Sequence, residues 1–343
     1  MDLPFDVIRE VLSYWEEERS RDVTPWFYTK AVLQPSLFSA CLVGRVWNEV
    51  ATQVLYRDVY LGLQSHLRTF CLALDRREEL RLHVRSIFFS SAFSDQWGDI
   101  DETAYAEPYL KHLHSICPNI HARKICAADN SRPRSQRALC TDVAGWHDAG
   151  LLTHLELEMN GAVPGGFCPE LSLPALEDLI IFGAKFDPQK SGSPWPNMPQ
   201  LRRLRLMKCI FAPSVPCLPT FENKPKGLRA FEIIGGIYRC RELHDAIRET
   251  RDSLEILALL PALCLGFQNF LGDLRALLSL RILPQYASIF TPADIPPRLT
   301  RLIFVDHKLQ DDVHLTENTI SLLRDPGELD RNCSLFKLLR MAG

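Results

Sequence analysis

The residues best suited to metal chemistry lie in a histidine-rich stretch. His112, His114, Cys117 and His121 carry the nitrogen and sulfur donors that zinc prefers. Their spacing matches no common structural zinc site, and His112 and His114 cannot share a helix face because they are two residues apart. We therefore expect no metal at this stretch.

The motifs of nucleotide-binding and hydrolytic enzymes are missing from the sequence. It has no P-loop, no G-x-S-x-G and no dinucleotide fingerprint. The neighbouring acids Asp311 and Asp312 lie in a polar stretch near the end of the chain, which favours solvated carboxylates over a catalytic pair. A hydrolase would need a nucleophile constellation that we do not find, so we expect a chain without cofactor or catalysis of its own.

Composition narrows the class of partner. The 343 residues, 46% of them hydrophobic, fit about two domains at ~150 residues per domain. Lys+Arg 39 against Asp+Glu 42 gives a net charge of −3, so no global basic field attracts nucleic acid or an anionic membrane. The cluster Arg202-Arg203-Arg205 is either a local contact point or a solvated edge.

The sequence indicates a reducing compartment and predicts no membrane-spanning helix. The longest uncharged stretch, Ile256 to Gly272, contains Pro261 and is shorter than the ~20 apolar residues of a spanning helix. The first residues lack the basic region of a secretory signal. The eleven cysteines are scattered without a C-x-x-C pair, which indicates free thiols in the cytoplasm or nucleus.

Two apolar ladders predict helices near the start of the chain. In Asp6–Trp15 the apolar residues fall at positions 7, 8, 11, 12 and 15, which is one helix face. A second helix is predicted from an N-cap at Ser36 through Val54, with Val43, Trp47 and Val50 on its apolar face. Such a module is either a helical cap with an ordinary core or a docking module with surplus apolar surface.

Together these ladders resemble an F-box. The matching motifs are Leu3-Pro4-x-Asp6-Val7-x-x-x-Val11-Leu12 and Cys41-Leu42-Val43-x-Arg45-x-Trp47-x-x-x-Ala51, followed by Leu55-Tyr56. The resemblance covers about residues 3–60, under a fifth of the chain. Two departures are Gly44, where many F-boxes carry Cys, and a long insert around Trp26–Lys30. Glycine weakens a helix by about 1 kcal/mol relative to alanine.

The resemblance implies docking to the Skp-type adaptor of an SCF (cullin–RING) ubiquitin ligase. Some matched residues must instead form the core of the module, Trp47 above all, and the sequence does not separate the two roles. The residues matched to the adaptor-binding motif are Leu3, Pro4, Val7, Ile8, Val11, Leu12, Leu42, Val43 and Trp47.

An L-x-x-L-x-L unit repeats through the rest of the chain. Seven copies begin at Leu152, Leu176, Leu201, Leu228, Leu254, Leu277 and Leu299, with spacings of 24, 25, 27, 26, 23 and 22 residues. Weaker copies begin at Val84 and at Ile120, where Arg123 breaks the pattern. The period resembles that of leucine-rich repeats, which stack short parallel strands into a curved sheet because no unit can bury its apolar face alone.

Side chains that alternate with the buried positions should face the concave side of this solenoid. The column formed by the residue after the third apolar position of each unit becomes apolar from the second unit onward, and arginines flank it. The column is either covered by a loop or the C-terminal segment, or it is a groove for an acidic or phosphorylated peptide. The candidate target-binding residues are Phe182, Arg203, Arg205, Met207, Arg281 and Arg301.

These observations predict an α/β protein with a helical F-box-like module at 1–60, an irregular leucine-rich-repeat solenoid at 61–305 and a C-terminal cap at 306–343. The cap is predicted to contain short helices at Glu317–Arg324 and Ser334–Met341. We expect a substrate-recognition subunit that binds a Skp-type adaptor and an unknown target protein. The alternative is a leucine-rich-repeat interaction scaffold without a ubiquitin link, its helical module serving as an N-terminal cap.

Overall fold

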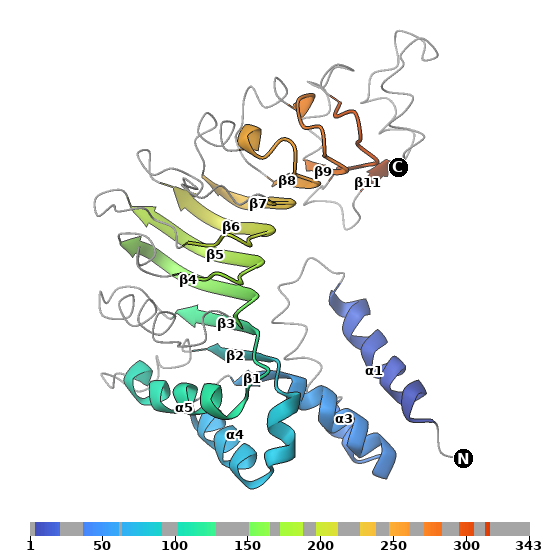
Figure 1. Cartoon of the computed structure of the whole chain (residues 1–343), viewed down its shortest axis with the longest axis vertical. Helices are drawn as coiled ribbons and strands as arrows, with labels where there is room; N and C mark the ends of the chain where they lie inside the picture. The colour runs from blue at the N-terminus through green and yellow to red at the C-terminus, as the bar shows by residue number, and fades with distance from the viewer. Residues whose placement is uncertain are drawn as a thin grey trace. The chain divides into compact units, whose positions relative to one another are not determined.

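Helices precede a series of parallel strands along the chain (Figure 1). The computed structural model describes residues 4–20, 37–61, 64–90, 102–127, 151–164, 172–187, 197–211, 227–237, 247–260, 271–282, 295–304 and 313–315. The chain forms two units, Met1–Glu156 and Leu157–Gly343. The predicted insert at 26–30, residue Leu3 and both predicted C-terminal helices lie outside the described residues, and the boundaries at 60 and 305 stay a prediction.

In the first unit, helix α1 (Phe5–Ser20) packs against helix α3 (Arg45–Arg57). Ile8 and Leu12 from α1 are fully buried against Val50 and Ala51 from α3. The first ladder therefore forms a helix as predicted. The prediction of one continuous helix from Ser36 is wrong, because helical residues 37–41 are followed by a turn before α3 begins.

Three parallel strands follow in the first unit: β1 (Asp58–Leu61), β2 (Ser86–Ser90) and β3 (Ala122–Ala127). Helix α4 (Gln64–Arg76), the 3-10 helix η1 (Glu78–His83) and helix α5 (Glu102–Ile116) connect them and share a buried core with them. The weaker repeat copies at Val84 and Ile120 are confirmed as strands. A further copy, Tyr56-x-x-Val59-x-Leu61, was missed because an aromatic residue stands at its first position.

The strong repeat units form the later strands. Each strand begins two residues after the first leucine of its unit, and β5 to β10 pair in parallel with their neighbours in chain order, whereas β11 runs antiparallel to β10 (Figure 1). The strands are β4 (His154–Pro164), β5 (Asp178–Asp187), β6 (Arg203–Phe211), β7 (Ala230–Ile237), β8 (Ile256–Leu260), β9 (Ser279–Ile282), β10 (Arg301–Phe304) and β11 (Val313–Leu315). The predicted α/β class, with helices followed by a leucine-rich-repeat-like parallel sheet, is confirmed.

The core of the repeats consists of the apolar positions of the unit. In the unit of Leu204, for example, Leu201, Leu204 and Leu206 are all fully buried. A fourth apolar position three residues before the first leucine is buried as well, at Leu173, Met198 and Leu274. Its backbone carbonyl accepts a hydrogen bond from the N–H of the first leucine, as from Leu201 to Met198 at 3.2 Å, so this residue closes the turn that leads into β5, β6 and β9.

Three neighbouring strands have a left-handed backbone conformation at equivalent positions. Gly183, Lys208 and Gly235 have φ values of 73, 51 and 65°. They directly follow Phe182, Met207 and Ile234, which pair across β5, β6 and β7. The left-handed conformation disfavours residues with a Cβ atom, so Lys208 is the unusual member of this series.

Among the described residues, no helix combines the length and the apolar character that crossing a bilayer requires.

We predict that Gly235→Ala lowers the free energy of unfolding by about 1 kcal/mol, because alanine is disfavoured at a positive φ. A Cβ atom at this position would meet its nearest neighbour, Lys208 Cγ, at 3.5 Å, so strain rather than a clash is the cause. Urea denaturation measures the change. Gly227→Ala is the matched control, since its Cβ would meet nothing within 4 Å and its φ is not left-handed. Equal effects of the two substitutions would contradict the explanation.

Candidate functional site

The helical module separates buried from exposed apolar residues. Ile8 and Leu12 are fully buried, and Trp47 is half-buried against the same core. By contrast, Leu42 is 86% exposed and Val43 is 67% exposed. Large apolar side chains with this exposure on one small module favour an interface over an ordinary surface.

A hydrogen-bonded turn holds Leu42 and Val43 in place. The backbone N–H groups of Leu42 and Val43 donate to the carbonyls of Ser39 and Ala40 at 3.0 and 3.2 Å. The Asn48 side chain donates to the carbonyl of Cys41 at 2.9 Å. The exposed pair is thus presented on an ordered turn, which reduces the conformational entropy lost when a partner binds.

Eight of the nine residues matched to the F-box motif are described, and they fall into different environments. Val7 and Pro4 are exposed and lie on the same ladder as buried Ile8 and Leu12, whereas Val11 is half-buried. Phe38, which is also exposed, was not predicted as a contact residue. The exposed apolar residues among the described part of the module form what we call the module surface: Pro4, Val7, Phe38, Leu42 and Val43.

On the repeats, the predicted target-binding arginines have different partners. Arg203 Nη1 lies 3.6 Å from Asp178 Oδ2 on the neighbouring strand. Arg205 Nη2 donates to Glu232 Oε1 at 3.0 Å, and Glu232 is buried. Both arginines are therefore neutralised within the sheet and are poorly suited as primary contacts for an acidic partner.

Register explains these pairs. Asp178 aligns with Arg203, and Arg205 aligns with Glu232, so each acid stands beside its arginine on the next strand. The regular spacing of the repeat units already placed these residues in the same columns of the sequence. That signal could have revealed the ion pairs before the structure was known.

The apolar column is only partly accessible. Phe182, Met207 and Ile234 are half-buried, and Leu260 is buried. The ammonium group of Lys208 lies 5.2 Å from the centre of the Phe182 ring, a cation–π contact. Arg281 is half-buried and Arg301 is exposed, and within the described residues neither side chain forms an ion pair or a hydrogen bond.

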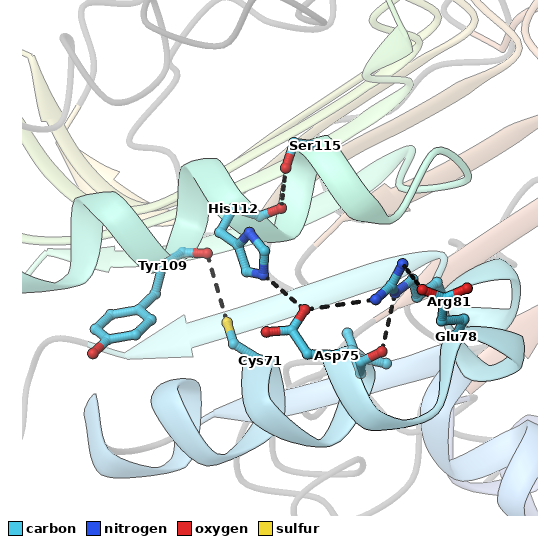
Figure 2. Close-up of polar contacts among 8 residues, drawn as sticks. Cys71, Asp75, Glu78, Arg81, Tyr109, His112 and Ser115 are labelled. Atoms are coloured by element: carbon cyan, nitrogen blue, oxygen red, sulfur yellow. Dashed lines mark hydrogen bonds and ion pairs between the residues drawn. The ribbon is translucent and has the colours of Figure 1, made fainter.

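A second polar cluster joins α4, η1 and α5 in the first unit (Figure 2). His112 Nε2 lies 2.9 Å from Asp75 Oδ1, and Arg81 Nη2 lies 3.6 Å from the same oxygen. The Cys71 thiol donates to the carbonyl of Tyr109 at 3.7 Å, and Arg81 also contacts Glu78 (Figure 2). A thiol, an imidazole and a carboxylate are the residue types of a cysteine-nucleophile site.

The environment of the thiol does not suit that chemistry. Burial, reinforced by the charge of Asp75, raises the pKa of Cys71 to about 12, so the thiol stays protonated at neutral pH. Its hydrogen bond also runs to a backbone carbonyl instead of to His112. The contacts of the cluster therefore connect α4, η1 and α5. Across the part of the chain that the structure describes, no three His, Cys, Asp or Glu side chains are placed to hold a metal ion.

Comparison of the sequence with models of protein families and with curated proteins finds no match.

We predict that Arg205→Ala lowers the free energy of unfolding by about 2 kcal/mol, because it leaves the buried Glu232 carboxylate without its partner. Arg203→Ala should cost less than about 1 kcal/mol, since the Arg203–Asp178 pair is longer and its arginine is more exposed. Chemical denaturation of both variants tests the ranking. Equal losses would contradict the larger stabilisation that we assign to the Arg205–Glu232 pair.

We also expect alkaline destabilisation of the first unit. Burial raises the pKa of Cys71 to about 12 and that of Cys117 to about 11, above the ordinary value of 9.0. Because the folded-state pKa is raised, the stabilisation is complete below pH ~9 and is lost as the pH rises toward 11–12. Urea denaturation at a series of pH values should show a smaller alkaline loss for Cys71→Ala than for the native chain. An unchanged slope would contradict the assigned cause.

Proposed function

We propose that the chain is the substrate-recognition subunit of an SCF ubiquitin ligase. The observation that carries the proposal is the ordered, exposed Leu42-Val43 turn on a helical module that precedes a leucine-rich-repeat-like sheet. The module surface would bind a Skp-type adaptor, and the repeats would bind a target protein. Such a subunit acts in the cytoplasm or nucleus.

The proposed mechanism needs no catalytic residue in this chain. By holding a target beside the ubiquitin-loaded enzyme, the subunit raises the effective concentration of the target's lysines there. Apolar contacts suit the adaptor side because burying a side chain of leucine or valine size contributes about 2 kcal/mol. Ile8 and Leu12 support the module from within, and we assign them no direct contact with the adaptor.

The alternative function is a leucine-rich-repeat interaction scaffold without a ubiquitin link. The packing of α1 on α3 around an apolar core supports that alternative as well, because a terminal cap of a solenoid also needs a core. The two functions differ in the role of the module surface. A cap has no use for an exposed Leu42-Val43 turn, whereas an adaptor-binding module depends on it.

Co-purification with a Skp-type adaptor tests the proposal. We predict that the full chain retains the adaptor and that the double variant Leu42→Asp/Val43→Asp weakens binding more than tenfold, since about 2 kcal/mol is lost for each apolar side chain. Both side chains are exposed, so the substitutions should leave the fold intact.

Leu82→Asp is the matched control. Leu82 is 60% exposed in the same unit but lies on η1, outside the module surface. It should leave adaptor binding unchanged. Failure of the native chain to retain an adaptor that binds a known F-box protein would favour the scaffold function. Equal losses for the control and the double variant would remove the module surface from the proposal.

A further inference from the structure

Two arginines occupy the middle column of the sheet, which is the repeat position between the second and third apolar residues. Their neighbours on the adjacent strands differ. Arg205 on β6 aligns with Glu232 on β7 and donates to its carboxylate at 3.0 Å. Arg281 on β9 aligns with Ile303 on β10, so an apolar side chain stands where the first arginine has its acid. The arginine at this repeat position therefore has an acidic neighbour on β7 in one case and an apolar neighbour on β10 in the other.

The surroundings of Arg281 make its charge costly. Its other aligned neighbour, Ala258 on β8, is fully buried, and Ile303 is buried too. Arg281 itself is half-buried, and within the described residues its side chain forms no hydrogen bond or ion pair. A cation that is partly removed from water without a partner loses solvation energy, which an anion supplied by another molecule would recover.

Arg301 adds a second cation on the same face. It lies two residues before Ile303 on β10 and is therefore a diagonal neighbour of Arg281. Arg301 is exposed and also has no ion pair within the described residues. Strands β8, β9 and β10 carry no acidic residue. Within the described residues, neither arginine has an acidic partner of the kind seen on β5 to β7.

We propose that Arg281 and Arg301 bind an acidic segment of the target protein, in which a carboxylate occupies the position that Glu232 holds beside Arg205. The inference rests on the proposed function for the identity of the partner as a target. It commits to side-chain carboxylates because Glu232 is the anion that this sheet already accepts in the equivalent position. A guanidinium binds a carboxylate through directional, charge-assisted hydrogen bonds.

The test uses the full chain without any adaptor and a fluorescein-labelled hexaglutamate peptide, with binding followed by fluorescence anisotropy. We expect the native chain to bind the peptide and to lose affinity as salt is raised. Arg281→Gln should weaken binding about tenfold or more, because it removes a charge-assisted hydrogen-bond donor. Arg298→Gln is the matched control: it removes an exposed arginine that precedes β10 and should change affinity less than about twofold.

A second variant provides an internal competitor. Ile303→Glu places a carboxylate beside Arg281 as Glu232 stands beside Arg205, and it should weaken peptide binding as much as Arg281→Gln does. Arg281→Lys keeps the charge and should restore part of the affinity. Thermal unfolding of each variant, followed by circular dichroism, shows whether the chain is folded, and the comparison of Arg281→Gln with Arg281→Lys remains decisive if Ile303→Glu unfolds.

Three results would overturn the site. These are equal losses for Arg281→Gln and Arg298→Gln, unchanged binding by Ile303→Glu in a folded chain, and binding of a phosphoserine peptide with none of hexaglutamate. The double variant Leu42→Asp/Val43→Asp should bind the peptide normally. If the native chain binds the peptide but no Skp-type adaptor, the proposed function fails and this inference stands, whereas adaptor binding without peptide binding gives the reverse outcome.

Discussion

The repeats depend on one recurring backbone interaction. The backbone carbonyl of the residue after the first buried leucine of a unit accepts hydrogen bonds from two N–H groups of the next unit. The carbonyl of Arg202 accepts from Arg229 and Ala230 at 2.7 and 3.0 Å, and that of Glu255 accepts from Leu278 and Ser279 at 2.8 and 2.9 Å. This double acceptance fixes where each strand begins relative to its neighbour. Because side chains alternate along a strand, a slip of one residue would exchange buried and exposed positions.

Much of the fold could be predicted because burial requires the same residue types in every unit. Each of the seven strong copies contains one of the strands β4 to β10, which begins two residues after the first leucine, and even the broken copy at Ile120 leads into a strand. The copy at Tyr56 was missed, since its tyrosine satisfies the same position with a different side chain. The helix break before α3 was missed for another reason. Apolar periodicity continues through Leu42 and Val43, yet these residues occupy a turn, and periodicity alone does not report where hydrogen bonding changes.

The helical module shows why sequence motifs do not separate core from interface. Leu12 and Leu42 have identical side chains and belong to the same motif, but one is fully buried and the other is 86% exposed. The difference arises from backbone geometry. Residues of α1 at the spacing of one helix face meet α3, whereas the turn points Leu42 away from that core. An exposed leucine fixed on a turn that the Asn48 side chain stabilises is better prepared for a partner than one on a free chain.

The arginines of the sheet extend the same reasoning from apolar to charged residues. Arg205 and Arg281 occupy one column, and neither the residue type nor its place in the repeat distinguishes them. Their neighbours on the following strand do: Glu232 accepts a hydrogen bond from Arg205, whereas the apolar side chain of Ile303 offers no acceptor to Arg281. An arginine with its acid on the next strand contributes to the stability of the sheet. An arginine beside an apolar residue lacks such an acid and is available to bind an anion from another molecule. The register of the strands decides which kind of neighbour each arginine has.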